Sequence, residues 1–360
     1  MKIVHCIYSF NVGGAETMLV DIVNEQVASH DVTLIIVNDS YSQILLDQID
    51  RRVSIIRIKR KAGSLNPWSF IHLNYILYTG KYDIIHLHSP SLSRVLLGTM
   101  KSKIVYTTHC LGVDIKDILR GGHVFAISES VRNDLLVRGQ GIINADRIVV
   151  VPNGVRFDAI RSRIEYRSSH RFSIINVARL DSELKGQDIL IRAIALLKNR
   201  GIEHLCVDFI GEGRSRELLE NLSEDLDVSE QVRFLGLKDR EYIYQHLCEY
   251  DLMCHPSRFE GFGLTVAEGM AAKLPVLVAT GDGPYEIIGQ GKYGFSFENG
   301  SVESCADMLQ YIVEHYDEAL QKVEQSYEHI ETNYSLRKMV AEYFEEYQNA
   351  LIDCDQKKEI

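Results

Sequence analysis

Long apolar runs are missing from this sequence of 360 residues. No run reaches the roughly 18 residues that a membrane-spanning helix needs. The opening segment, MKIVHCIYSFNVGGAE, is a short apolar strand followed by glycines, which differs from the apolar core and small-residue cleavage site of a signal peptide. We therefore expect a cytoplasmic protein, and nothing in the composition calls for a nucleic-acid partner.

Paired cysteines are missing as well. The cysteines are odd in number and scattered, and no two of them have the C-x-x-C spacing. A disulfide framework or a cysteine zinc site is therefore disfavoured, and buried thiols in a reducing compartment are expected. The positions are Cys6, Cys110, Cys206, Cys248, Cys254, Cys305 and Cys354.

Two ligand-binding signatures are also absent. The segment YSFNVGGAE places Gly13 and Gly14 after the first expected strand, but it is not the G-x-G-x-x-G of dinucleotide-binding proteins, which disfavours a dehydrogenase. The D-x-D triplets lie at 225–227 and 353–355, in a helical stretch and in the tail, so no metal-diphosphate motif is evident. His86 and His88 share one strand face and could formally chelate a metal, but no acidic or cysteine third ligand lies nearby in the sequence. We expect no metal and no cofactor.

What the sequence does contain is an alternation of apolar strands with longer helical patterns. This pattern is typical of a parallel sheet covered by helices on both faces. It pauses at the basic stretch 147–170, which reads as a linker, and then restarts, so two doubly wound Rossmann-like domains are expected, over 1–165 and 166–335. From Ser301 onward the chain is expected to be mostly helical. The expected strands lie at 2–8, 31–37, 53–58, 82–88, 103–109, 123–128, 172–178, 204–211, 231–236, 250–257 and 274–280.

Charge divides the chain in the same way. Residues 1–170 hold 20 Lys and Arg against 15 Asp and Glu, whereas residues 171–360 hold 19 against 35. The first part is therefore basic and the second strongly acidic, which suggests domains that face different partners.

Several loops after strands carry candidate site residues. Gly13 and Gly14 would let a backbone approach a ligand and aim N–H groups at an anion, or they would form a tight turn that needs positive φ. His109 ends a strand, where a lone histidine is more often structural than catalytic. Arg179 also ends a strand, and Lys185 stands immediately before a helix, against the helix dipole. These two cations would neutralise a departing diphosphate, or they would be solvated surface charges.

The segment EGFGLTVAEGMA raises the sharpest question, because it places Glu260 and Glu268 eight residues apart with little bulk between them. A helix that begins near Gly263 offers unpaired N–H groups to an anion. The two carboxylates could each accept hydrogen bonds from paired hydroxyls, as on a sugar and a ribose. The alternative is that Glu260 is a loop-surface charge and Glu268 an exposed helix residue. The small residues nearby are Gly261, Gly263, Gly269, Ala271 and Ala272.

Taken in order and spacing, these segments resemble the retaining glycosyltransferases of the GT-B fold, family 4 type (glycosyl transferases group 1). The resemblance covers nearly the whole chain. It rests on GGAE from Gly13, His109, VPNGV from Val151, VARL with Arg179, KG with Lys185, GEG from Gly211, the pair Glu260 and Glu268, and the closing segment YSLRKMVAEYFEEYQNAL.

The resemblance implies that the C-terminal domain holds a nucleotide-diphosphosugar and the N-terminal domain an acceptor, with a C-terminal helix at about 336–360 packed back on the N-terminal domain. It implies that Glu260 contacts the donor sugar, that Glu268 holds the ribose, and that His109 meets the sugar. The diphosphate would be bound by Arg179, Lys185 and the N–H groups of Leu264 and Thr265, with Gly14 beneath it. The full set of implied catalytic and donor-binding residues is His109, Arg179, Lys185, Glu260, Gly13, Gly14, Gly211, Gly261, Phe262, Gly263, Leu264, Thr265 and Glu268.

The implied activity is that of a hexosyltransferase or N-acetylhexosaminyltransferase. The donor would be a UDP-sugar by family frequency, and the acceptor a saccharide or a lipid-linked saccharide in bacterial envelope polysaccharide synthesis. A GT-B sugar-nucleotide epimerase or phosphorylase, or a non-catalytic sugar-nucleotide-binding protein, are the alternatives. One position departs from the family, because Cys110 follows His109 where many relatives have an acidic residue.

The stretch from Arg51 to Tyr78 suggests contact with the inner face of the cell membrane. Its basic residues precede an apolar helix rich in aromatic side chains, a combination suited to an anionic lipid surface. The alternative is that these cations are strand-edge charges and that the aromatic side chains face the core. The residues concerned are Arg51, Arg52, Arg57, Lys59, Arg60, Lys61, Trp68, Phe70, Tyr75 and Tyr78.

Overall fold

The structure, a computed structural model, describes residues 1–118, 122–166 and 171–356. The chain divides into two compact units, one made of Met1–Gly154 with Leu336–Ile360 and the other of Val155–Ser335. The boundary of the second unit thus lies at Val155, whereas the sequence places it after residue 165. Backbone hydrogen bonds explain the difference, since the N–H of Arg161 donates to Tyr244 O (3.0 Å) and that of Arg163 to Ala272 O (2.9 Å).

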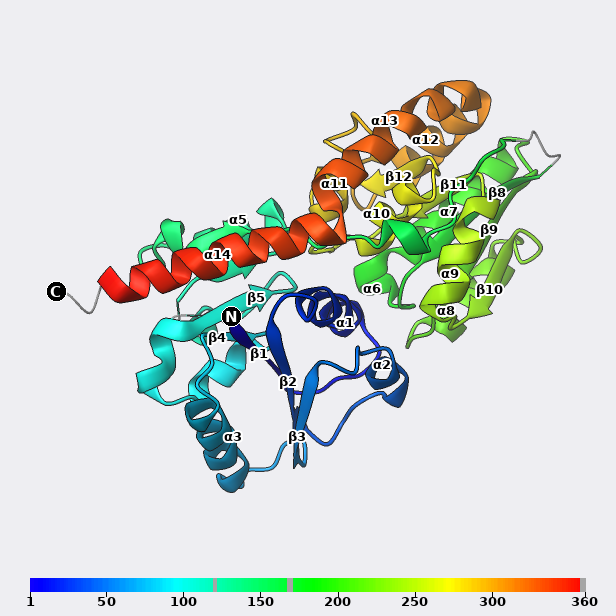
Figure 1. The fold of residues 1–360 in the computed structure, drawn as a ribbon. Coiled ribbons are helices and arrows are strands. Elements are labelled where there is room, and N and C mark those ends of the chain that lie inside the picture. Colours follow the sequence, from blue (N-terminus) through cyan, green and yellow to red (C-terminus); the bar gives the residue numbers. More distant parts are fainter. Residues whose placement is uncertain (119–121, 167–170, 357–360) are drawn as a thin grey trace. The chain divides into compact units, whose positions relative to one another are not determined.

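The first unit contains a parallel sheet of seven strands in the order β3-β2-β1-β4-β5-β6-β7 (Figure 1). Strands such as β1 and β5 are buried almost throughout, which explains their continuous apolar sequences. The strands are β1 (Lys2–Ile7), β2 (Asp31–Asn38), β3 (Ser54–Arg60), β4 (Ile84–Leu87), β5 (Ile104–Thr108), β6 (Val124–Ala126) and β7 (Ile148–Val150). The helices are α1 (Gly14–Gln26), α2 (Gln43–Asp47), α3 (Trp68–Thr79), α4 (Ile115–Ile118), α5 (Glu129–Arg138) and α14 (Leu336–Gln356).

The second unit contains a parallel sheet of six strands in the order β10-β9-β8-β11-β12-β13. The strands are β8 (Phe172–Val177), β9 (Leu205–Ile210), β10 (Val232–Gly236), β11 (Leu252–His255), β12 (Val276–Ala279) and β13 (Phe295–Phe297). The helices are α6 (Ser182–Lys185), α7 (Gln187–Asn199), α8 (Arg216–Asp225), α9 (Arg240–His246), α10 (Leu264–Ala271), α11 (Gly283–Ile287), α12 (Val302–Glu314) and α13 (Tyr316–Tyr334). Short 3-10 helices occupy Pro90–Val95, Gly98–Lys103, Ala145–Arg147, Phe157–Ala159 and Leu247–Glu249.

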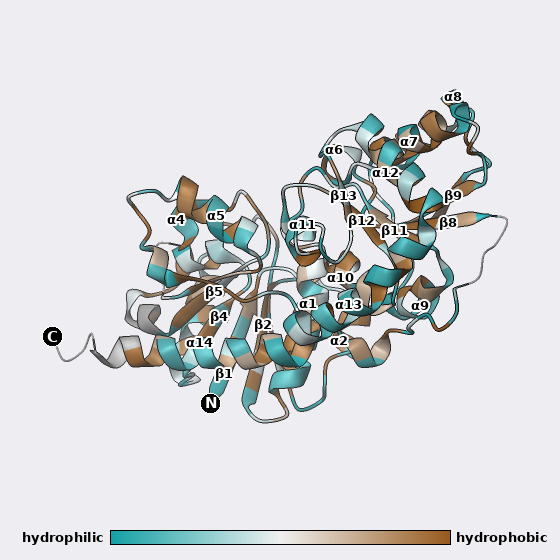
Figure 2. Ribbon diagram, turned by 90° about the horizontal axis from the view of Figure 1, so that it is seen from above, coloured by the Kyte–Doolittle hydropathy of each residue, from teal (hydrophilic) through white to brown (hydrophobic). Residues whose placement is uncertain are grey.

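Both units are therefore doubly wound α/β sheets, with the hydrophobic strands inside and helices of mixed polarity around them (Figure 2). In each sheet the first strand of the unit is the third in order, and the strand order reverses beside it, between β1 and β4 and between β8 and β11. Ligands of such sheets bind outside the carboxyl ends of the strands at this reversal. Among the described residues, no helix is both long and apolar enough to cross a bilayer.

The structure departs from the sequence interpretation in four details. The linker stretch contains strand β7, and the region before Ser301 contains β13, which the sequence did not predict. Lys185 does not simply precede a helix, because it ends a short helix of its own, α6. The expectation of buried thiols fails at Cys110, which is exposed.

Candidate active site

The candidate site of the second unit lies at the carboxyl ends of two neighbouring strands. Arg179 follows β8, and Glu260 follows β11, which is hydrogen-bonded to β8 in the sheet. The carboxyl ends of parallel neighbours lie at the same edge, so the fold itself brings these loops together at the reversal of strand order.

The backbone at Arg179 is fixed by the loop that follows β9. The N–H of Leu180 donates to Glu212 O (3.1 Å), and the first side chain of α7, Gln187, donates from Nε2 to Arg179 O (2.9 Å). Gly211 has φ +141, and a Cβ there would lie 2.0 Å from Ala178 O. Glycine at this position is thus required by the close approach of two backbones, which holds the Arg179 loop in place.

The side chain of Arg179 is only loosely held. It is 64% exposed, and its Nη2 lies 3.7 Å from Oδ2 of Asp181, which Arg214 also contacts at 3.0 Å. An exposed pair of this kind contributes little to stability. The guanidinium can therefore turn to an anionic ligand at small cost.

Lys185 and Glu260 form an ion pair that is mostly withdrawn from water. The N–H groups of Arg258 and Phe259 both donate to Leu184 O (2.9 and 3.2 Å), which ties the loop after β11 to the end of α6. Lys185 Nζ then donates to Glu260 Oε2, and the two side chains are 19% and 20% exposed. The interpretations of Lys185 and Glu260 as solvated surface charges are therefore wrong.

Glu260 has a second partner, His255, that the sequence analysis missed. His255 Nε2 lies 3.3 Å from Glu260 Oε2 and 2.9 Å from Ser257 Oγ. Burial alone would raise the pKa of Glu260, but the hydrogen bond from His255 and the charge of Lys185 outweigh it and lower that pKa to about 2. The signal was present in the sequence, because a histidine that ends a strand five residues before Glu260 must lie at the same sheet edge.

Helix α10 begins beside this pair without a capping side chain. Its N-cap, Gly263, has φ +93, a conformation that favours glycine, and a Cβ there would lie 2.7 Å from Pro284 Cγ. The first N–H groups of the helix, at Leu264 and Thr265, thus start next to the loop that carries Glu260, as an anion site requires. Phe262 contributes only backbone here, since its ring is buried near that of Tyr334 (5.8 Å between centroids).

Glu268 lies inside the protein rather than on the helix surface. It is 5% exposed and accepts a hydrogen bond from Tyr244 OH (2.9 Å), while Arg240 Nε lies 4.0 Å from the same oxygen and 2.5 Å from Tyr244 OH. The alternative of an exposed helix residue is therefore wrong. This cluster fixes the orientation of the Glu268 carboxylate inside the protein.

The first unit carries the remaining candidates. Gly13 caps α1 with φ −169, and Gly14 is helical, so neither glycine is needed for a turn with positive φ, and that alternative is wrong. A Cβ at Gly14 would meet no atom within 4 Å. His109 follows β5 and is half-buried, with Nε2 3.1 Å from His88 Nδ1, and burial lowers its pKa to about 4.

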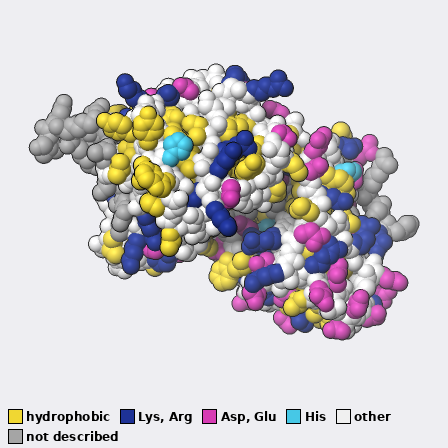
Figure 3. All heavy atoms as spheres, turned by 90° about the horizontal axis from the view of Figure 1, so that it is seen from below, with side chains coloured by type: hydrophobic (Ala, Val, Ile, Leu, Met, Phe, Trp, Pro, Cys, Tyr) yellow, Lys and Arg dark blue, Asp and Glu magenta, His cyan; other side chains and the backbone are white. Residues whose placement is uncertain are grey.

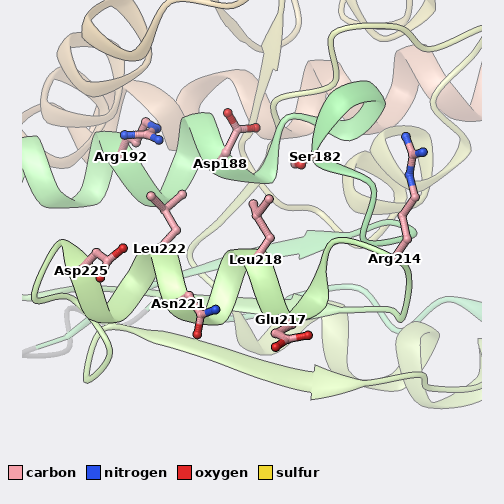
Figure 4. Close-up of a pocket in the computed structure, with 9 residues that line it drawn as sticks. All are labelled: Ser182, Asp188, Arg192, Arg214, Glu217, Leu218, Asn221, Leu222 and Asp225. Atoms are coloured by element: carbon pink, nitrogen blue, oxygen red, sulfur yellow. The ribbon is translucent and has the colours of Figure 1, made fainter.

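None of these candidate residues lines a groove of about 600 Å³ between α7 and α8 (Figure 4). Three carboxylates line it, those of Asp188, Glu217 and Asp225, against two arginines. Arg214, one of the two, is already paired with Asp181 and Glu183. A groove with this charge balance does not suit a diphosphate.

Comparison with known proteins places this geometry in context. The model of "Glycosyltransferase Family 4" matches residues 12–159, and that of "Glycosyl transferases group 1" matches residues 161–329. EpsD of Bacillus subtilis, which is named as a glycosyltransferase, is 26% identical over 88% of this chain and 89% of its own. The phosphatidyl-myo-inositol mannosyltransferase of Mycobacterium leprae is 28% identical over 65% of this chain and 64% of its own. The crystal structure of Anabaena HepE in complex with UDP and glucose superposes with a TM-score of 0.79 at 21% identity and covers 97% of this chain and 100% of that one.

The two doubly wound units and the match to HepE define the GT-B fold. The two family matches together span residues 12–159 and 161–329, and the two relatives described above are glycosyltransferases by name. The chain belongs to the glycosyl transferases group 1, as the sequence resemblance implies.

Proposed function

We propose that the protein is a retaining hexosyltransferase or N-acetylhexosaminyltransferase. It moves a sugar from a UDP-sugar to a saccharide or lipid-linked acceptor in bacterial envelope polysaccharide synthesis. The observation that carries the proposal is the cluster at the carboxyl ends of β8 and β11, where two cations and an uncapped helix N-terminus lie beside a carboxylate held ionised. HepE was crystallised with UDP and glucose, and the M. leprae relative acts on a phosphatidylinositol by name, which support the donor and acceptor classes.

In this proposal Arg179, Lys185 and the N–H groups of Leu264 and Thr265 stabilise the negative charge that develops on the leaving diphosphate. Glu260, ionised at neutral pH, accepts hydrogen bonds from donor-sugar hydroxyls, and Glu268 accepts them from the ribose. Because Lys185 is paired with Glu260 in the structure, donor binding places a second anion next to this lysine. The two cations supply the role that a metal ion fills in other enzymes, so activity without a divalent ion is expected.

The remaining residues admit or contact the donor. Gly13, Gly14, Gly211, Gly261 and Gly263 keep side chains away from it, and Phe262 acts through its backbone. Gly14 is the clearest case in the first unit, because the fold itself has room for a side chain there. His109 contacts a hydroxyl of the donor sugar.

The experiment that tests this function is a donor panel. Purified protein is screened by thermal shift against UDP-, GDP- and ADP-sugars, since a ligand at a hundred times its Kd stabilises the native state by about 2.7 kcal/mol. The stabilising sugar nucleotide is then incubated with lipid-linked saccharides, and transfer is followed by mass spectrometry. Binding without transfer or hydrolysis would favour the sugar-nucleotide-binding protein, and an isomerised or phosphorolysed product would favour the epimerase or phosphorylase.

We also propose that the first unit docks on an anionic membrane that carries the acceptor. On α3 the large side chains point outward, with Trp68, Tyr75 and Tyr78 71%, 65% and 72% exposed, so the aromatic side chains do not all face the core. Figure 3 shows hydrophobic side chains gathered on this end of the unit with Lys and Arg side chains beside them. The cations Arg51, Arg52, Arg57, Lys59 and Lys61 are exposed, whereas Arg60 is half-buried and donates to Asn38. Such a surface suits anionic lipid.

Sedimentation with vesicles of phosphatidylglycerol tests the docking. We expect binding at low ionic strength and its loss as salt screens the charges. Replacing Lys59 and Lys61 by Gln should weaken it by about thirtyfold, at roughly 1 kcal/mol for each cation. Leu237→Ser, at a side chain of the second unit that is 67% exposed, is the matched control and should bind as the wild type does. No vesicle binding at low salt would leave a soluble acceptor.

A further inference from the structure

The first unit holds four histidines in a row across three neighbouring strands. His5 lies within β1 and pairs in register with His86 of β4. His88 comes directly after β4 and donates its backbone N–H to Cys6 O (2.9 Å). His109 comes directly after β5. The row thus runs from the inside of the sheet to its carboxyl edge.

Three of these rings form a continuous hydrogen-bonded chain that starts at a glutamine of α1. Gln26 Oε1 lies 2.8 Å from His5 Nε2, and His5 Nδ1 lies 3.0 Å from His88 Nε2. His88 Nδ1 in turn lies 3.1 Å from His109 Nε2. Gln26 and His5 are fully buried, and His88 is 6% exposed. The chain therefore connects a buried amide to the proposed sugar-binding residue.

Burial favours the neutral form of all four imidazoles. Burial lowers the pKa of His5 and of His109 to about 4. Burial, reinforced by the neighbouring rings, lowers the pKa of His86 and of His88 well below 6.5. A neutral imidazole carries one proton, so one of its nitrogens donates and the other accepts.

The amide of Gln26 sets the direction of the whole chain. Its Nε2 lies 3.4 Å from Tyr347 OH, which leaves Oε1 as the acceptor for His5. His5 then donates from Nε2 and accepts at Nδ1, so His88 donates from Nε2 and accepts at Nδ1. That acceptor requires the proton of His109 to be on Nε2, and it leaves Nδ1 of His109 as a hydrogen-bond acceptor.

We propose that Gln26, His5 and His88 are positioning residues that hold His109 in one tautomer, with Nε2 protonated and Nδ1 presented to a hydroxyl of the donor sugar. This inference rests on the proposed function, in which His109 contacts that sugar. A sugar hydroxyl is a donor as well as an acceptor, so a fixed acceptor on the protein selects the direction of its hydrogen bond. The buried residues of the chain thus keep Nδ1 of His109 unprotonated at the edge of the sheet.

A metal site is the competing interpretation, because His5, His86 and His88 offer nitrogen atoms within 4.8 Å of one another. Each ring nitrogen of these three residues, however, already has a partner. Those of His86 lie 2.6 Å from Tyr347 OH and 2.7 Å from Thr107 Oγ1. A metal ion would have to displace these hydrogen bonds in a buried place, so the geometry favours the hydrogen-bonded chain.

The direct test is the tautomer of His109 in donor-free protein. Protein labelled with 15N in histidine is recorded by two-bond 1H–15N correlation, and the His109 signals are assigned by their loss in His109→Gln. We expect the pattern of an Nε2-protonated neutral ring at pH 7. An Nδ1-protonated ring, or a stoichiometric transition metal measured in the purified protein, would overturn the proposal.

Variants test the coupling. His88→Phe removes the partner of His109, and we expect mixed His109 tautomers and a kcat/KM for the donor about tenfold lower, as for the loss of one hydrogen bond. Gln26→Leu, which is remote from His109 and conserves size, should also mix the tautomers and keeps the test open if His88→Phe does not fold. His86→Phe is the control for damage to the core, since His86 is as deeply buried and contributes no ring nitrogen to the chain, and it should change the His109 signals and kcat/KM much less than His88→Phe does.

The outcomes separate this inference from the proposed function. Transfer activity with an Nδ1-protonated His109 would refute the positioning role alone. Absence of any sugar transfer would refute the proposed function, while the tautomer measurement would still stand. Equal losses of kcat/KM in His86→Phe and His88→Phe would show general damage to the core and would also refute the chain.

Discussion

Replacing Glu260 by Gln tests the electrostatics of the proposed donor site without changing its shape. The substitution removes the charge that pairs with Lys185 and contacts His255. In the wild type these partners lower the pKa of Glu260 from 4.5 to about 2. A carboxyl group with a depressed pKa stabilises the folded state above its unfolded-state pKa, and the contribution is lost as the pH falls through the folded-state pKa.

The magnitude follows from this shift. Each pKa unit corresponds to about 1.4 kcal/mol, so the shift contributes about 3 kcal/mol to the second unit at pH 7. The side chain is 20% exposed, so screening by solvent reduces this value only in part. By the same linkage relation the contribution falls to about 2 kcal/mol at pH 3.5 and disappears below pH 2. The wild type should therefore have a higher unfolding free energy than Glu260→Gln, and this difference should become smaller as the pH falls from 7 to 3.5.

The assay must report on the second unit, because the single tryptophan, Trp68, lies in the first. Urea unfolding at pH 7 and at pH 3.5, followed by hydrogen exchange of peptides from β11 and α10, meets this need. Glu183→Gln serves as the control, since this glutamate of α6 is 77% exposed. This substitution should leave the unfolding free energy unchanged at pH 7 and at pH 3.5. No gap at pH 7, or a gap of equal size at both pH values, would refute the assignment of Glu260 as a stabilised buried anion.

The other predictions concern the chemistry. Arg179→Ala should lower turnover about a hundredfold, on the order of 3 kcal/mol, and leave stability unchanged, whereas Lys185→Ala should lower both because Glu260 loses its partner. Near-normal rates in both variants, or a wild type that needs a divalent ion, would contradict these roles. NMR of the product should show that the transferred sugar keeps the anomeric configuration that it had in the donor. We expect the acceptor to attack from the face that the diphosphate leaves, with the leaving phosphate taking the acceptor proton. An inverted anomeric carbon in the product would exclude retention. A trapped covalent adduct between the sugar and Glu260 would exclude the same-face mechanism but not retention. Glu268→Gln should weaken binding of the nucleotide, measured calorimetrically, more than it lowers kcat.

The sheets could be read from the sequence because strands buried on both faces are continuous apolar runs. KIVHCI and LCVDFI, for example, are strands β1 and β9. Strands β7 and β13 escaped because each has only three residues. Strand β13 lies between Gly294 and Glu298, and β7 lies inside a stretch that is otherwise polar and basic. Helix α6 has only four residues and escaped as well, and with it the fact that Lys185 ends this helix in addition to preceding α7.

Contacts between side chains of different strands and loops could not be predicted from apolar runs. The loop positions of Arg179 and Glu260 follow from the ends of their strands, but the contact of Glu260 with Lys185 depends on backbone hydrogen bonds from Arg258 and Phe259 to Leu184 O. The sequence likewise shows the face shared by His86 and His88 but not that His5 lies beside them, because one sequence does not reveal the register of β1 against β4.

Helix α14 has a consequence for how the protein is made. Its residues Tyr343 and Tyr347 are fully buried and complete the hydrogen bonds of Thr107 and His86, yet all of the second unit precedes α14 in the chain. At about 5–20 residues per second, a ribosome needs roughly ten to forty seconds to pass from Gly154 to the end of α14. During that interval the first unit lacks α14, which covers its buried histidines. The second unit is one uninterrupted segment of the chain and does not need α14 for its own core. The core of the first unit is therefore completed only after the whole second unit has been synthesised.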